Sequence, residues 1–175
     1  MEIDFNNIDK YTVPISEFRF KWRFTEEKYS VLPDIHLNQL KPLDSKAALF
    51  LSNYISKVDL HADAPFKKNF FRTVDNINVV EDNNDEIKKW LYQRGLPFDK
   101  SVYLSWDNEN AMIVPWKILI KYFDCFYYGG SDDLTVFDES LQWALMFAHW
   151  DTIYFGTNKD FVPSSIIENL KSNVT

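Results

Sequence analysis

The sequence predicts an α+β fold, in which an antiparallel sheet of about five strands carries helices from the N-terminal half of the chain on one face. Helical spacing of apolar residues is concentrated before residue 100, strand patterns with short polar turns dominate after it, and the two patterns are segregated. At 175 residues and 46% hydrophobic content, the chain is large enough for one substantial core. We therefore expect a single domain over residues 1–175.

Residues 134–156 have the clearest strand pattern. Their aromatic and β-branched residues form runs that fit a pleated, half-buried surface, and the polar residues between the runs tolerate turn geometry. We expect a meander of three strands at residues 134–137, 141–147 and 153–155.

The N-terminal part begins with another strand pattern. In residues 18–24, FRFKWRF, four aromatic residues alternate with three cations, which predicts a strand with rings on one face and cations on the other. Residues 33–40 predict a short helical turn that ends before Pro42.

Three helices are predicted next. The first follows Asp44 or Ser45 as the N-cap and carries apolar residues at helical spacing as far as Val58. Residues 66–74 have Phe and Val at the same spacing, and residues 85–94 have acids at the start, cations near the end and a following Gly and Pro. Loops are expected at residues 59–65 and 80–85.

The C-terminal half adds a hairpin and further short elements. Residues 102–104 and 111–114 predict two strands around a turn, and Pro115 suits the first position of a helix that runs to residue 123. We also predict a strand at residues 126–128 and a short terminal helix after Phe161.

Cysteine content, the first ten residues and hydropathy all favour a cytoplasmic location. The single cysteine, Cys125, cannot form an internal disulfide, and residues 1–10 are acidic, unlike a secretory signal. No apolar run approaches the ~20 residues that cross a bilayer. We expect a soluble cytoplasmic protein with no membrane partner.

The net charge of −7 is placed unevenly. Residues 101–175 contain ten acids and four bases, whereas residues 1–100 contain sixteen acids and fifteen bases. The excess carboxylates fall at predicted turns, where they attract cationic partners and repel nucleic acid. The alternative is that this charge serves solubility alone.

Catalytic motifs are missing from the sequence. It contains no phosphate-binding glycine loop, dinucleotide fingerprint, HExxH, GxSxG or paired-cysteine motif. His149 is the best catalytic candidate because it follows a predicted strand and Asp151 is close enough to orient its ring; the alternative is a residue that caps the turn. Cys125 lies among aromatic residues, which predicts a buried small hydrophobe.

Metal and nucleic-acid binding are both disfavoured. His61 and Asp63 alone do not complete a metal site, so we expect no metal and no cofactor. A nucleic-acid surface would use Arg19, Lys21, Arg23 and residues 67–72. In the predicted strand, however, the cations lie on the face opposite the rings, and the chain is acidic overall.

Residues 138–156, DESLQWALMFAHWDTIYFG, resemble the terminal hairpin of small bacterial immunity proteins that protect cells from polymorphic toxins, including contact-dependent growth inhibition toxins. The resemblance is carried by Trp143 in a strand, His149 and Asp151 at the turn, and the aromatic-glycine end at residues 154–156. It covers this hairpin only.

The resemblance implies an inhibitor of a cognate toxin, many of which are cationic nucleases, and not an enzyme. Carboxylates would pair with toxin lysines and arginines, and exposed rings would anchor the interface. The candidate residues are Asp107, Glu109, Asp132, Asp133, Asp151, Trp106 and Trp150. A small cytosolic enzyme with a site near His149 is the alternative, and the oligomeric state stays open.

Overall fold

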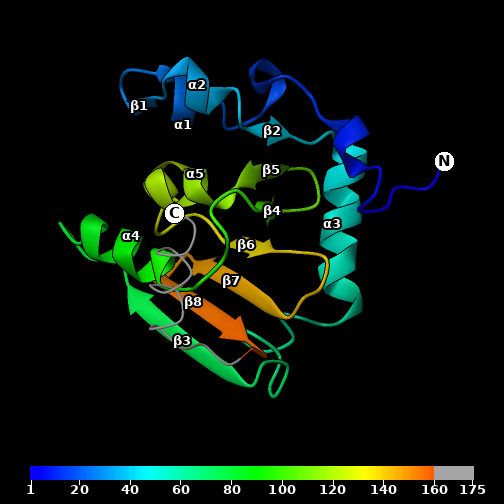
Figure 1. Ribbon diagram of the computed structural model, residues 1–175, viewed down its shortest axis with the longest axis vertical. Coiled ribbons are helices and arrows are strands. Elements are labelled where there is room, and N and C mark those ends of the chain that lie inside the picture. Colours follow the sequence, from blue (N-terminus) through cyan, green and yellow to red (C-terminus); the bar gives the residue numbers. More distant parts are fainter. Residues whose placement is uncertain (160–175) are drawn as a thin grey trace, which may run out of the picture.

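The computed structural model describes residues 1–159, which form one antiparallel sheet of seven strands. In Figure 1 the strands follow one another from β2 at the top to β3 at the bottom. In this order they are β2 (Lys41–Pro42), β5 (Ala111–Pro115), β4 (Ser101–Ser105), β6 (Leu134–Phe137), β7 (Trp143–Ala148), β8 (Thr152–Thr157) and β3 (Thr73–Asn78). The predicted α+β class is confirmed, with seven strands instead of about five.

Helices cover both faces of this sheet, whereas the sequence predicts helices on one. Helix α3 (Ser45–Lys57) packs on one face, and α4 (Asn84–Tyr92), α5 (Trp116–Lys121) and α6 (Phe123–Phe126) pack on the other (Figure 1). Strands β5 and β7 are apolar on both faces, because alternate residues of each enter two different clusters. A sheet that is buried on both sides needs a helical layer on each.

Shorter elements complete the N-terminal part. These are the 3₁₀ helices η1 (Ile8–Tyr11) and η2 (Ile15–Glu17), helices α1 (Trp22–Thr25) and α2 (Asp34–Leu37), and strand β1 (Ser30–Val31). Helix α2 confirms the helical turn predicted after Pro33.

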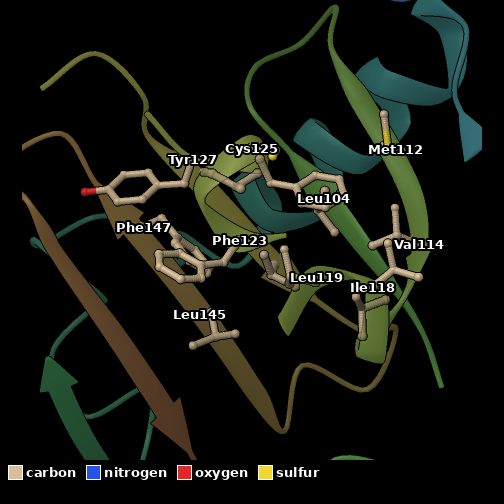
Figure 2. Close-up of a cluster of buried hydrophobic side chains, with 14 of the residues drawn as sticks. Leu104, Met112, Val114, Ile118, Leu119, Phe123, Cys125, Tyr127, Leu145 and Phe147 are labelled. Atoms are coloured by element: carbon tan, nitrogen blue, oxygen red, sulfur yellow. The ribbon is translucent and has the colours of Figure 1, made fainter. Parts of the chain in front are cut away.

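The larger core lies between the sheet and helices α4 to α6. Figure 2 shows part of it, where Leu119 and Phe123 lie beside Leu145 and Phe147 of β7. Phe123 and Phe147 are almost fully buried. Truncating such a ring to alanine costs about 3–5 kcal/mol, so this core fixes the position of β7 firmly.

The best-predicted helices have local signals. The Asp44 side chain accepts a hydrogen bond from the Ala47 N–H at 2.9 Å and caps α3, while Ala48, Leu51 and Ile55 are buried. Helix α4 also lies where it is predicted, and Gly95 follows it with φ of 79°. The hairpin β4–β5 and the meander β6–β7–β8 are confirmed as well. The helix predicted at residues 115–123 is α5, with Pro115 as its N-cap.

Three predicted elements are wrong. Residues 18–24 are not a strand, because the chain turns there and enters α1 with Arg23 buried. Residues 66–74 are not a helix: turns there lead into β3, and Phe71 packs against Gly156 of β8. Residues 126–128 are not a strand, because α6 extends to Phe126. The predicted terminal helix lies outside the described residues.

The register of the sheet brings distant loops to one end. Ser105 is aligned with Thr135, Thr135 with Met146, Met146 with Tyr154, and Tyr154 with Asn76. The chain therefore leaves or enters the sheet at this same end in five segments, residues 43–44, 79–83, 106–110, 128–133 and 149–151.

Candidate functional site

All seven candidate binding residues lie in segments at this one end of the sheet. Trp106, Asp107 and Glu109 follow β4, whereas the other four precede β6 or connect β7 to β8. Strand β6 pairs directly with β4, and β7 lies one strand further, so the two groups start one to two strand spacings apart, roughly 5–10 Å. Their side chains nevertheless have different environments, and they divide into internal and exposed residues.

Asp132 is an internal residue. Its carboxylate forms a bidentate ion pair with Arg23, with Nη1–Oδ2 at 2.5 Å and Nη2–Oδ1 at 3.0 Å, and it also accepts the Tyr128 N–H at 2.8 Å. The side chain is 8% exposed. Asp132 is therefore neutralised inside the protein and does not present a charge to a partner.

Trp106 is also committed to internal packing. Its ring lies 5.5 Å from that of Phe18 and 5.9 Å from that of Phe20, and its indole N–H donates to the Phe126 carbonyl at 3.1 Å. The residue joins the start of the β4–β5 turn to the core, and its polar atom is already paired.

Asp107 shapes the β4–β5 turn. Its carboxylate accepts the N–H groups of Glu109 and Asn110, both at 2.8 Å, and the Asn110 side-chain amide at 2.9 Å. This is the pattern of an Asx turn, so the residue type is explained by turn geometry. Glu109 is exposed beside it and contributes to a hollow near the start of α3.

The remaining candidates come together on one exposed surface. We call Asp133, His149, Trp150, Asp151 and Tyr154 the turn surface, because they surround the β7–β8 turn. Tyr154 is not among the seven predicted binding residues, although it belongs to the aromatic-glycine end at residues 154–156. The signal for it was the hairpin register, which places Tyr154 on β8 close to the turn.

Asp133 holds His149 by two hydrogen bonds. Its Oδ1 accepts the His149 backbone N–H at 2.9 Å and lies 3.0 Å from His149 Nδ1. Because a carboxylate only accepts, Nδ1 is the protonated ring nitrogen and Nε2 faces away from the pair. Both side chains are about half exposed, at 55% for His149 and 52% for Asp133.

Trp150 is exposed but held in place. The residue is 41% exposed, and its indole N–H donates to the Tyr154 hydroxyl at 2.9 Å. The His149 ring packs edge-on against it, with centroids 4.9 Å apart and an angle of 83°. A large apolar ring at the surface thus has a defined orientation before any partner arrives.

Asp151 closes the turn in a left-handed conformation, with φ of 57°. Aspartate tolerates this region better than most residues. Its N–H donates to the Ala148 carbonyl at 3.1 Å, and its carbonyl accepts the Val79 N–H at 2.8 Å. The side chain lies over Gly129, where an added Cβ would be only 1.9 Å from Asp151 Oδ1.

Two further contacts fix the turn to the segment before β6. The Gly130 N–H donates to the His149 carbonyl at 3.0 Å, and the buried Tyr127 hydroxyl donates to the Ala148 carbonyl at 2.5 Å. Burial raises the pKa of Tyr127, and the nearby carboxylates Asp151, Asp132 and Asp133 raise it further. The phenol therefore stays a neutral donor beneath a region of negative potential.

The other candidates for chemistry lie elsewhere. His61 bridges the Pro65 carbonyl and the Thr135 hydroxyl, at 2.7 and 2.8 Å, and burial lowers its pKa. Cys125 is buried, and burial raises the pKa of its thiol, in line with the predicted small hydrophobe. Among residues 1–159, no three His, Cys, Asp or Glu side chains are placed to hold a metal ion.

The turn surface presents exposed side chains, among them the imidazole of His149. Three surface hollows are lined by other residues: one by residues around His61, one along α3 near Leu49, and one near Glu109. Because His149 Nδ1 is bonded to Asp133, Nε2 is the one nitrogen of this ring left to act on a bound molecule.

Within residues 1–159, every helix is too short or too polar to span a membrane.

Comparison with known proteins identifies no relative of this chain. No family model, no curated protein and no solved structure matches the chain.

Proposed function

We propose that this protein is an immunity protein, which binds a cognate bacterial toxin, in particular a cationic nuclease domain, and occludes its active site. The turn surface would make the contact. The observation that carries the proposal is the exposed ring of Trp150, held by Tyr154 and His149 and flanked by the carboxylates of Asp133 and Asp151.

An oriented tryptophan is the residue type that most often dominates a protein interface. Its ring buries a large area and has only two rotatable side-chain bonds to immobilise. Here the bond to Tyr154 and the contact with His149 already restrict those bonds. Little conformational entropy would be lost on binding, which supports a role for Trp150 as an anchor.

The charge of the surface suits a cationic partner. Asp133 and Asp151 are exposed, the first beside His149 and the second within the β7–β8 turn, while Asp132 is already paired with Arg23. Carboxylates in such positions can replace the phosphates of a nuclease substrate and raise the association rate. The proposed contact therefore uses fewer residues than the sequence predicts, because Trp106, Asp107 and Asp132 already make contacts inside the protein.

A small enzyme with a site near His149 is the second candidate. The observation that favours it is the Asp133–His149 pair, which orients an imidazole as the acid and histidine of a catalytic triad do. On this alternative, His149→Ala abolishes an intrinsic activity of the isolated protein. For an inhibitor, the same change alters only binding.

Calorimetric titration tests the proposal. The titrant is the C-terminal domain of the protein encoded by the adjacent upstream gene, used at low and moderate salt. We expect one-to-one binding that weakens with salt, and a loss of roughly 30-fold or more in affinity for Trp150→Ala, the level of an interface hot spot.

Matched controls come from the opposite end of the sheet. Glu139 is an exposed acid in the β6–β7 turn, so Glu139→Gln should leave binding unchanged, whereas Asp151→Asn should weaken it and reduce its salt dependence. Phe98 is an exposed ring before β4, and Phe98→Ala is the control for Trp150→Ala. No heat at either salt, or equal effects of these pairs, would contradict the proposal.

A further inference from the structure

Strand β3 is an edge strand of unusual regularity. All six of its residues pair in register with β8, and five of the six are exposed. Within the described part of the chain, β8 is the only strand that pairs with β3. Natural sheets usually protect such an edge with lysine, proline, a bulge or a covering segment. Strand β3 contains neither lysine nor proline, and its pairing has no bulge.

The direction of its backbone groups follows from the neighbouring strand. The Asn158 N–H donates to the Gln142 carbonyl on the β7 side, so Phe155 and Thr157 direct their groups toward β3. Their partners Asp75 and Thr73 bond to β8. The alternate residues, Val74, Asn76 and Asn78, therefore direct their N–H and C=O groups away from the sheet.

Two of these outward groups are capped by side chains. The Asn76 N–H donates to Asp75 Oδ1 at 2.8 Å, and the other oxygen of Asp75 accepts from Arg94 Nη1 at 3.0 Å. The Asn78 carbonyl accepts from Asn83 Nδ2 at 2.8 Å, while Asn83 Oδ1 accepts the Val80 N–H at 3.1 Å. Each cap is therefore held by a second contact.

We propose that Asp75 and Asn83 are gatekeepers that prevent β3 from pairing with β3 of a second copy of the chain. Only registers that oppose outward-directed residues can form hydrogen bonds. Centring the pairing on Asn76 satisfies this condition and places Asp75 opposite Ile77 of the other copy. Centring it on Asp75 would oppose two carboxylates, which is destabilising.

In the favoured register, the caps block the bonds on which the pairing depends. The two Asn76 residues would exchange N–H···O=C bonds at the centre, but Asp75 occupies both donors. The Val74 N–H would donate to the Asn78 carbonyl of the other copy, but Asn83 occupies that acceptor. Only the bond from the Asn78 N–H to the Val74 carbonyl remains on each side, too few to join two sheets.

The test is the mass of the released variant. Asp75→Thr combined with Asn83→Ala removes both caps and places a strand-favouring residue at position 75. Light scattering over a roughly hundredfold concentration range should show the mass of one chain for the natural protein and an approach to twice that mass for the variant. Asp75→Asn alone retains an acceptor for the Asn76 N–H and should stay monomeric.

A third substitution identifies the surface. Asn76→Pro removes the central outward donor but no bond to β8, so adding it to the double variant should restore the monomer. A folded double variant that stays monomeric overturns the proposal, as does a dimer that Asn76→Pro leaves intact, or a natural dimer that Asn76→Pro dissociates. Amide exchange of the natural protein tests the cap without any variant: an Asn76 amide as fast as that of exposed Glu139 also overturns it.

Discussion

The guanidinium of Arg23 and the carboxylate of Asp132 form a buried bidentate ion pair between residues 109 positions apart. The guanidinium also lies between the rings of Phe20 and Tyr128, with its central carbon 4.4 and 4.1 Å from their centroids. This pair joins α1 to the segment that carries Asp133. It explains why a cation of the FRFKWRF stretch points inward.

Removing one member of this pair should be costly. Arg23→Met leaves the Asp132 carboxylate buried without its partner, so we expect a loss of about 3–5 kcal/mol in the free energy of unfolding. Urea unfolding followed by circular dichroism measures it. Arg23→Met with Asp132→Asn removes the orphaned charge and should recover a large part of the loss; equal stability of the single and double variants would show that the charge is not the cause.

Acid should weaken the protein through Asp138. Burial alone would raise the pKa of this carboxyl, but hydrogen bonds from Ser140, Lys100 and Trp143 outweigh it and hold the pKa below its usual value of 3.8. A lowered pKa adds stability that is complete above the unfolded value and is lost as pH falls through the folded one. The urea midpoint of unfolding should therefore decrease less between neutral pH and about pH 3 for Asp138→Asn than for the natural protein. An equal fall in both would contradict this.

Gly129→Ala should displace the turn surface. The new Cβ would meet Asp151 Oδ1 at 1.9 Å, so the Asp151 side chain must move. Gly130→Ala is the matched control, since it has φ of 80° and no atom within 4 Å of an added Cβ. It should cost roughly 1–2 kcal/mol through backbone strain without moving the turn.

The readout is the indole N–H signal of Trp150 in a proton–nitrogen spectrum. We expect it to shift in Gly129→Ala and to stay in place in Gly130→Ala. Because glycine accepts the φ of residue 151, adding Asp151→Gly to Gly129→Ala should relieve the overlap and recover stability. A Trp150 signal that is the same in all variants would show that Gly129 does not control the turn.

Tyr154→Phe should show whether the orientation of the Trp150 ring contributes to binding, because it leaves Trp150 itself unchanged. It removes the hydroxyl that accepts the Trp150 indole N–H but retains the ring. The free energy of unfolding should change by less than about 0.5 kcal/mol, because the bond is exposed. Affinity for the toxin domain should fall about tenfold because the free indole is less ordered. Unchanged affinity would show that the bond does not prepare Trp150 for binding.

Elements with local signals were predictable, and elements defined by distant partners were not. Helix α3 has its cap and its apolar face within its own sequence. The alternation at residues 18–24 does not determine the local structure, because the conformation there depends on a distant partner: Arg23 pairs with Asp132. Strand β3 is largely polar and lies at an edge, so it lacks the apolar alternation of a half-buried strand. Phe71, which precedes it, packs against Gly156 of β8, a contact that only the assembled sheet defines.

The binding candidates divide for the same reason. Turn position correctly indicates that Asp133 and Asp151 are exposed, but it cannot distinguish Asp133 from the adjacent Asp132, which points inward to Arg23. Trp106 and Trp150 both stand at strand ends, and only the packing of Phe18 and Phe20 shows which of them is covered.

The order of strands also constrains synthesis of the protein. Strand β3 is made early, yet its partner β8 ends at Thr157, 84 residues after Thr73. A nascent or prematurely terminated chain that lacks β8 therefore has an unpaired β3 and an open β7 edge at the same time, both prone to incorrect pairing. The seven strands can all pair only after synthesis has passed Thr157, the end of β8, and shorter products carry exposed strand edges.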